Sequence, residues 1–107
     1  MKILLVCAFG MSTSIIADKI RAAKAPDEDL VVEAKEVSDF RESIKNYDVA
    51  LLGPQIGFRL EEFSKIAKPY GVPVMVINSM DYGLCKGDAI LKAAKEKYKE
   101  GISDDKN

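Results

Sequence analysis

A lone cysteine stands where an apolar run of the sequence ends and a loop of small residues begins. Residues 2–7 read KILLVC, and residues 8–14 continue as AFGMSTS, so Cys7 is followed by Gly10 and then by the hydroxyl residues Ser12, Thr13 and Ser14. The sequence contains no histidine. Cysteine–histidine and serine–histidine–aspartate catalysis within these residues is therefore excluded, and the chemistry available at this loop is that of a thiol.

The composition of the loop predicts an anion cradle around the cysteine sulfur. Gly10 can adopt a positive φ at no steric cost, which lets successive amide N–H groups point inward. A helix that begins at about Ser12 adds its unsatisfied N–H groups and the positive end of its dipole, and Ser12, Thr13 and Ser14 can cap it. The same field favours a thiolate, so we expect a lowered pKa for Cys7. The sequence thus predicts a thiolate nucleophile inside a site of phosphate size.

Three kinds of phosphate chemistry can be compared with this loop. A nucleotide-binding P-loop ends in Gly-Lys-Ser/Thr, which is absent here. A receiver-type aspartyl phosphate site needs acidic residues where this chain has Cys7 and Gly53-Pro54. A cysteine phosphatase has arginine at the position that Thr13 occupies. Without that guanidinium, hydrolysis should be slow, whereas backbone donors can still hold a thiophosphate, so the comparison favours a phosphate carrier.

Two other functions stay open on the same residues. In a small cysteine phosphatase, Asp81 of the segment DYG (81–83) could protonate a leaving group. In a redox-sensing thiol module, Cys7 and Cys85 could form a reversible disulfide. Each alternative has its own assay, because a phosphatase hydrolyses a phosphate ester steadily whereas a sensor bonds its two cysteines reversibly.

Composition and charge narrow the class of protein. The 107 residues are 48% hydrophobic and 31% charged, with a formal net charge of -1 and a sequence pI near 5.5. These values are typical of a soluble globular domain. The near-neutral charge argues against the basic surface that nucleic-acid binding requires. No stretch approaches the length of a membrane span, so we expect a cytoplasmic protein without direct membrane insertion. The two cysteines lack metal-site spacing, and we expect neither a metal nor another cofactor.

Apolar segments rich in β-branched residues alternate with segments of helical period. This alternation predicts strands at 2–7, 30–37, 48–53 and 72–78, and helices at 12–25, 38–46, 57–70 and 88–100. Ser38 is the expected N-cap of the second helix and Gly71 the expected end of the third. Residues 1–101 are predicted to form a single domain, and residues 102–107 a frayed polar tail.

Periodicity also predicts which side chains of two helices are buried. In helix 12–25 the expected inner face is Ile15, Ile16, Ile20 and Ala23, and in helix 57–70 it is Leu60, Phe63, Ile66, Ala67 and Tyr70. Four strands that are each followed by a helix predict an α/β fold. We expect an open, doubly wound parallel sheet in the order 2-1-3-4, with helices on both faces.

This topology predicts where a ligand binds. In an open parallel sheet the site lies beyond the carboxyl ends of the strands, where the direction of winding reverses. Here that point falls between the first and third strands. The loops 7–14 and 53–57 are therefore expected to meet there.

Three segments together resemble a known protein family. CAFGMSTS (7–14), LLGPQI (51–56) and YG (82–83) are similar to the cytoplasmic IIB component of the bacterial phosphoenolpyruvate-dependent sugar phosphotransferase system (PTS), lactose/cellobiose/chitobiose branch. The resemblance extends from residue 2 to about residue 100. It implies a fold like that of the low-molecular-weight cysteine phosphatases. One departure is Phe9, where this branch commonly has alanine.

The resemblance implies a role for this chain in a phosphoryl relay. A phosphohistidine on a IIA partner would phosphorylate Cys7, and the phosphocysteine would then phosphorylate a sugar, here a β-linked disaccharide, that arrives through the membrane component IIC. The protein would thus act at the inner face of the membrane. The residues implied to hold the phosphoryl group, chiefly through backbone amides, are Ala8, Phe9, Gly10, Met11, Ser12, Thr13 and Ser14.

Further residues are candidates for the second loop and for the rim of the site. Pro54 and Gln55 either contribute to the site or form a turn, and Tyr82 either covers the site or packs against the last helix. Phe9, Met11 and Phe58 are expected near the loop rim, where an apolar collar would dock IIA and exclude water. For Met11 and Phe58 the alternative is a side chain that turns inward, and Cys85 is expected to be buried or half-buried.

Overall fold

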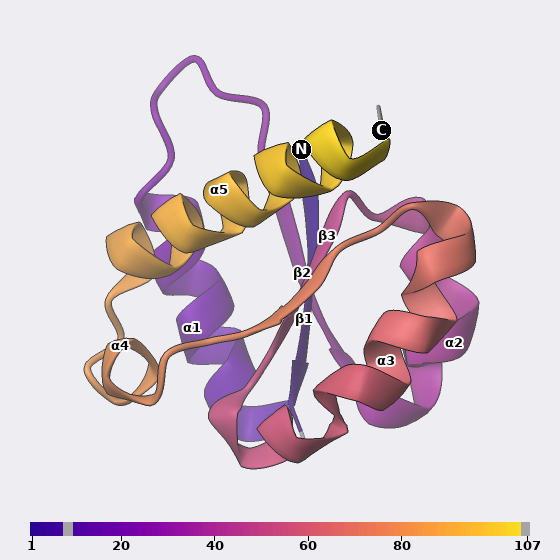
Figure 1. Cartoon of the computed structure of the whole chain (residues 1–107). Coiled ribbons are helices and arrows are strands. Elements are labelled where there is room, and N and C mark those ends of the chain that lie inside the picture. The colour runs from indigo at the N-terminus through magenta and orange to yellow at the C-terminus, as the bar shows by residue number, and fades with distance from the viewer. Residues whose placement is uncertain (8–9, 106–107) are drawn as a thin grey trace.

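The protein is built around a four-stranded parallel sheet. The computed structural model describes the backbone of residues 1–7 and 10–105 and the side chains of residues 1–6 and 14–100. The strands are β1 (Lys2–Cys7), β2 (Val31–Glu36), β3 (Val49–Leu52) and β4 (Val74–Val76). Their order is β2-β1-β3-β4 (Figure 1), which confirms the predicted topology.

The two central strands form the buried spine of the sheet. Every side chain of β3 and those of residues 3–6 of β1 are fully buried. The two strands pair in register from Ile3 opposite Val49 to Val6 opposite Leu52. Strand β2 alternates between exposed and covered side chains and pairs with β1 alone in the sheet. Its weaker apolar pattern is therefore that of an edge strand, as the sequence predicts.

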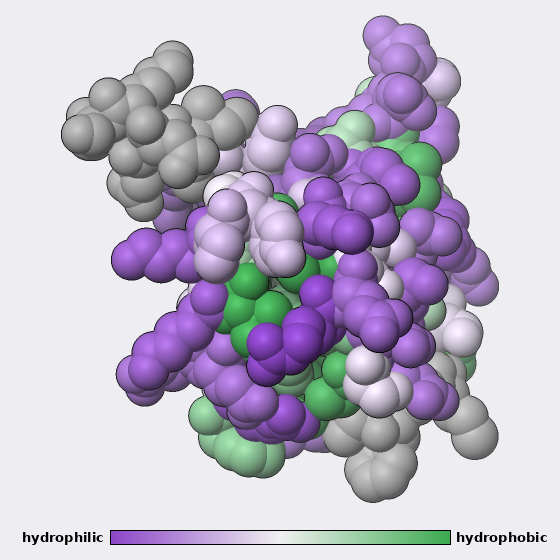
Figure 2. Space-filling view, turned by 90° about the vertical axis from the view of Figure 1, so that its right-hand side faces the viewer, coloured by the Kyte–Doolittle hydropathy of each residue, from purple (hydrophilic) through white to green (hydrophobic). Residues whose placement is uncertain are grey.

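Helices cover both faces of the sheet and divide the core into two layers. Helices α1 (Gly10–Ala22) and α5 (Gly87–Asp105) cover one face, and α2 (Phe40–Ser43) and α3 (Leu60–Ala67) cover the other (Figure 1). Alternate residues of β1 serve the two layers, with Ile3 and Leu5 facing α1 and α5 and Leu4 and Val6 facing α2 and α3. On the α2 and α3 face, apolar surface is visible in a hollow between polar side chains (Figure 2).

Several helical segments are shorter or more broken than the sequence predicts. The region 37–46 consists of a 3-10 turn η1 (Val37–Asp39), then α2, then a second turn η2 (Ile44–Asn46). The region 54–70 likewise divides into η3 (Pro54–Arg59), α3 and η4 (Lys68–Tyr70). Gly71 ends the last of these with a φ of 69°, as predicted. Asp39, and not Ser38, occupies the N-cap of α2, and it makes no side-chain cap.

Three helix ends differ from their expected positions for identifiable reasons. Helix α1 begins at Gly10 and ends at Ala22. It ends there because the amides of Ala23 and Lys24 donate hydrogen bonds to the carbonyl oxygens of Ile20 and Arg21, as in tight turns. Pro26 follows, and proline disfavours helix in the residue that precedes it. Helix α5 runs to Asp105, through most of the predicted frayed tail. A five-residue helix α4 (Ser79–Gly83) has no counterpart among the predicted elements.

Two predicted inner-face residues lie on the surface. Ile15 of α1 is exposed, and Ala17 takes its place in the core beside Ile16 and Ile20. Tyr70 is exposed as well. It falls in η4, where the helix has tightened into a 3-10 turn, so its position no longer follows the period that buries Phe63 and Ala67.

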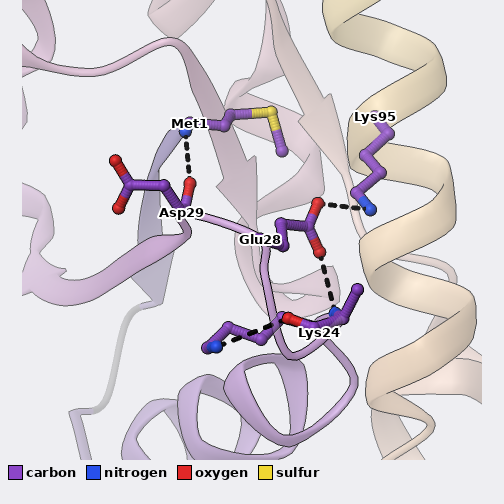
Figure 3. A network of polar contacts seen from close by, with 6 residues as sticks. Met1, Lys24, Glu28, Asp29 and Lys95 are labelled. Atoms are coloured by element: carbon purple, nitrogen blue, oxygen red, sulfur yellow. Dashed lines mark hydrogen bonds and ion pairs between the residues drawn. The ribbon is translucent and has the colours of Figure 1, made fainter.

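A polar network attaches the connection between α1 and β2 to helix α5 (Figure 3). The carboxylate of Glu28 accepts a hydrogen bond from the amide of Ala25 at 3.1 Å and pairs with the Lys95 ammonium at 2.5 Å. The amino group of Met1 donates to the carbonyl oxygen of Asp29 at 2.8 Å. These contacts fix a connection that has little apolar surface to bury.

Among the residues that the structure describes, no helix is long and apolar enough to cross a bilayer.

The Glu28 pair gives the stability of the fold a pH dependence. The hydrogen bond from Lys95, followed by that from Ala25, holds the pKa of Glu28 below its ordinary value of 4.5. Because the folded-state pKa is lowered, the pair stabilises the fold above the unfolded-state pKa and loses this effect as the pH falls through the folded-state pKa. We expect Glu28→Gln to lower the urea midpoint at neutral pH and to have no effect in acid below both pKa values.

The control for this prediction is Asp27→Asn, which removes a carboxylate from the same connection and leaves the Glu28–Lys95 pair in place. A urea midpoint difference for Glu28→Gln that persists unchanged in acid would contradict the assignment.

Helix α5 begins in close contact with the backbone of α1. A β-carbon at Gly87 would lie 2.8 Å from the amide nitrogen of Ile20 and closer still to the carbonyl group of Lys19. Backbone atoms cannot give way as the end of a flexible side chain can. The two helices therefore pack this closely only because residue 87 has no side chain.

We expect Gly87→Ala to force α1 and α5 apart and to destabilise the fold by about 2 kcal/mol or more, the range of an overpacked core. Equilibrium unfolding in urea measures this change. Gly83→Ala is the matched control, because a β-carbon there meets nothing within 4 Å. Its stability should be unchanged or slightly raised, since alanine is the better helix former. Equal stability of the two variants would show that the close approach is absent.

Candidate functional site

The candidate site lies at the carboxyl edge of the sheet, between β1 and β3. Helix α1 follows β1 onto one face, whereas α3 follows β3 onto the other, so the winding reverses between these two strands (Figure 1). The amide of Gly53 donates to the carbonyl oxygen of Val6 at 2.8 Å. The loop after β3 thus starts beside the end of β1, at the place where the sequence predicts that loops 7–14 and 53–57 meet.

Cys7 is the last residue of the central strand β1. Its backbone pairs in register with Glu36 of β2, and helix α1 begins three residues later, at Gly10. Ala8 and Phe9 lie outside the described residues, as do the side chains of residues 7–13. The backbone therefore passes from the end of a buried strand to the start of a 13-residue helix within two residues, which is the strand-to-helix connection that the sequence predicts for a nucleophile.

The start of α1 at Gly10 changes the expected roles of the loop residues. Gly10 is the first residue of α1 and so belongs to the helix, two residues before the expected start at Ser12. Ser12, Thr13 and Ser14 are the third, fourth and fifth residues of α1, and therefore none of them is its N-cap. The unsatisfied amides of a helix belong to its first turn, which moves the expected donors toward Gly10 and Met11. The side chain of Ser14 is exposed.

The second loop is a 3-10 segment packed against the end of β4. Gly53 precedes η3 in an extended conformation, and Pro54 is its first residue. Ile56 is buried, and its amide donates a hydrogen bond to the carbonyl oxygen of Gly53 at 3.0 Å. A β-carbon at Gly57 would lie 3.1 Å from Val76 of β4. Pro54 is half-buried and Gln55 is exposed, so of these two candidates Gln55 presents its side chain to solvent.

An arginine follows this loop and is held against α3. The Arg59 guanidinium donates two hydrogen bonds to the Glu62 carboxylate, at 3.0 and 2.9 Å, and lies 4.8 Å from the centre of the Phe63 ring. The hydrogen bonds from Arg59 lower the pKa of Glu62, and Arg41 of α2 contributes to this shift. The sequence reasoning did not single out Arg59, although its i, i+3 spacing from Glu62 is a signal for such a pair.

Helix α4 follows β4 at the same edge of the sheet. The side-chain oxygen of Asn78 accepts hydrogen bonds from the amides of Met80 and Asp81, at 2.9 and 3.1 Å, and so caps α4. An asparagine with an acidic residue three positions later is a known helix-start pattern, and it could have been found in the sequence.

Two of the three candidates in the segment that follows β4 pack against the core. Tyr82 is buried in the α1 and α5 layer, together with Ile77 and Ile90, so it packs against the last helix, which is one of its two expected roles. Cys85 is half-buried against the same layer, as predicted, and has a φ of 53°. Asp81 is half-buried in α4.

Phe58 of η3 is exposed. Its side chain is 84% accessible, which contradicts the alternative that it turns inward, and its place at the rim of the site stays a prediction. The two other residues of the expected collar, Phe9 and Met11, have side chains outside the described residues.

Comparison with known proteins identifies the family. The family model described as the lactose/cellobiose-specific IIB subunit of the PTS matches residues 2–93. The chain belongs to this family. It is therefore a sugar-specific PTS phosphotransferase component of the IIB type.

Individual relatives agree in both sequence and structure. The galactose-specific EIIB component of Lactococcus lactis subsp. cremoris (strain MG1363) is 40% identical over 99 residues, which cover 87% of this chain and 92% of that protein. The oligo-beta-mannoside-specific EIIB component of Bacillus subtilis (strain 168) is 34% identical over 103 residues, 95% and 93% of the two chains. The solution structure of the cellobiose-specific IIB component of Borrelia burgdorferi superimposes with a TM-score of 0.75 at 36% identity, covering 94% of both chains. The four-stranded parallel fold is thus that of IIB domains, and it agrees with the expected likeness to low-molecular-weight cysteine phosphatases.

The N-cap of α4 gives a test of how this edge is held. We expect Asn78→Ala to leave the amides of Met80 and Asp81 without an acceptor and to destabilise the protein by about 1 kcal/mol. Hydrogen exchange at these two amides should become faster than in the wild type. Asn78→Asp keeps an acceptor oxygen and is the matched control. Unchanged exchange in Asn78→Ala would contradict the capping role.

Proposed function

We propose that Cys7 of this IIB component accepts a phosphoryl group from a phosphohistidine of a IIA protein and passes it to a sugar delivered by the membrane component IIC. The single observation that carries this proposal is the position of Cys7 at the end of the central strand β1, with α1 beginning at Gly10. Ligands bind at this edge in open parallel sheets, and the backbone of Cys7 is paired on the β2 side.

Backbone amides are the proposed phosphate ligands. The first-turn N–H groups of α1 have no partner within the helix, and the helix dipole adds positive charge there. We therefore assign the phosphoryl group to the amides that run from Ala8 and Phe9 through Gly10, Met11 and Ser12. Thr13 and Ser14 stand later in the helix, so their hydroxyls are the groups left to contribute. Pro54 and Gln55 complete the proposed site from the second loop.

The transfer balances without any cofactor. In the first step the Cys7 sulfur attacks phosphorus, the S–P bond forms and the N–P bond to histidine breaks. The proton released by the thiol neutralises the departing imidazole. In the second step a sugar hydroxyl attacks phosphorus, the O–P bond forms and the S–P bond breaks, and the hydroxyl proton returns to the thiolate. The net reaction moves one phosphoryl group from histidine to sugar and regenerates Cys7.

The arrangement of the arginines supports a carrier over a hydrolase. The chain has three arginines. Arg21 donates to the carbonyl oxygen of Val32 and pairs with Asp18, and Arg59 is paired with Glu62. Arg41 lies near enough to Glu62 to lower its pKa. Arg21 and Arg59 are thus held by other groups, and position 13, where a cysteine phosphatase has the arginine whose bidentate contact speeds hydrolysis, is threonine here.

The names of the relatives support the proposed class of sugar. These relatives are named for galactose, oligo-beta-mannoside and cellobiose. We propose a β-linked disaccharide as the acceptor, with IIC presenting it at the inner face of the membrane. The IIB protein then works in the cytoplasm and reaches the membrane through IIC.

Labelling with radioactive phosphoenolpyruvate tests this function. In the presence of the general PTS proteins and a matching IIA, we expect one phosphoryl group per chain, bound to Cys7. Cys7→Ser should abolish the label, because a serine alkoxide is far harder to form than a thiolate. Cys85→Ser is the matched control, and it should retain full labelling.

The same preparation separates the alternatives. Steady hydrolysis of p-nitrophenyl phosphate that depends on Asp81 would replace the carrier by a phosphatase. Absence of any label, together with a reversible Cys7–Cys85 disulfide, would replace it by a redox sensor.

A further inference from the structure

Exposed apolar side chains gather along the carboxyl edge of the sheet. Six large hydrophobic residues are exposed in the described part of the chain. Two of them lie toward the amino edge of the sheet. Val31 is the first residue of β2, and Tyr70 precedes β4. The other four follow strand ends or the start of α1: Phe58 is 84% accessible, Met80 68%, Leu84 62% and Ile15 54%. We call these four residues the apolar arc.

The segments that carry the arc lie next to one another in the fold. A β-carbon at Gly57, next to Phe58, would lie 3.1 Å from the side chain of Val76 at the end of β4, and Met80 follows Val76 by four residues. At the other end, Gly87 abuts the backbone of Lys19, which places the segment after Leu84 against α1. Ile15 precedes Lys19 by one helical turn of α1. The segments that carry the arc are thus η3, α4 and the first half of α1.

We propose that the apolar arc is the docking surface for the protein that donates the phosphoryl group. The inference rests on the proposed function and specifies where the donor binds. It includes Phe58 of the collar expected from the sequence and extends that collar over α4, whereas the side chains of Phe9 and Met11 lie outside the described residues.

The geometry of transfer favours a protein donor as the occupant. A phosphohistidine is a side chain of a folded protein, and its nitrogen, the phosphorus and the Cys7 sulfur must come into line at the carboxyl edge. The donor surface around that histidine must therefore cover residues at this edge, and it must exclude water from the phosphoryl group. Phe58 and Met80 lie on the segments that border this edge, after β3 and β4.

The chemistry of the arc matches a partner that binds and leaves in every cycle. Four apolar side chains make a small contact, as in transient complexes. Methionine can repack against more than one surface. The charge beside Phe58 is balanced, because Arg59 is paired with Glu62. The donor is thus expected to present apolar residues around its histidine.

The test measures the rate of Cys7 phosphorylation at increasing concentrations of a purified IIA protein that is kept phosphorylated by phosphoenolpyruvate and the general PTS proteins. The variant is Met80→Ala combined with Leu84→Ala. We expect the KM for the donor to rise about tenfold, as for the loss of two apolar contact residues, with unchanged final labelling. Both side chains are exposed, and an unchanged urea midpoint verifies the fold.

The matched control is Val31→Ala combined with Tyr70→Ala, which removes the two exposed apolar side chains outside the arc. Its KM for the donor should equal that of the wild type. Equal KM values for all three proteins would overturn the docking surface while leaving the proposed function standing. A wild-type protein that no phosphorylated IIA can label would overturn the proposed function and the docking surface together.

Two further outcomes assign the arc to a different occupant. If the wild type self-associates and the Met80→Ala, Leu84→Ala variant is monomeric, with unchanged KM, the apolar arc binds a second copy of this chain. Unchanged KM with slower phosphoryl transfer to sugar in IIC-containing membranes would assign it to the transporter. Either outcome overturns the proposal.

Discussion

The pairing of β1 with strands on both of its sides is the constraint on which the rest of the structure depends. Strands β2 and β3 hydrogen-bond to its two edges, and helices cover both of its faces. A strand held in this way cannot move its carboxyl end, so the backbone of Cys7 has a fixed place at the edge of the sheet. The same double pairing creates the reversal of winding between β1 and β3. The loops that follow these strands therefore have a shared space between them.

The rigidity of the edge continues through its later elements. Segment η3 packs onto the end of β4, the side chain of Asn78 caps α4, and the close approach at Gly87 joins α5 to α1. Phe58, Met80 and Leu84 take no part in these contacts and are exposed to solvent.

Much of this site could be predicted from the sequence because its signals are local. The run KILLVC ends at Cys7 and the structure places β1 over the same six residues. Gly53 and Pro54 mark the end of a buried strand, and both stand at the start of η3. The start of α1 was predicted less well, because its first residues, 10–14, show little apolar periodicity in the sequence. The helix begins two residues before the predicted start.

The sequence by itself determined the succession of the four strands, the burial of the central strands and the position of the candidate nucleophile, since each depends on a run or a period within about ten residues. Tertiary structure alone decided which apolar residues remain exposed. Ile15 and Tyr70 fit a buried helical face by their spacing, and yet no neighbouring element covers them. A side chain is buried only when a second element packs over it. The spacing of apolar residues within one helix does not specify where that second element lies.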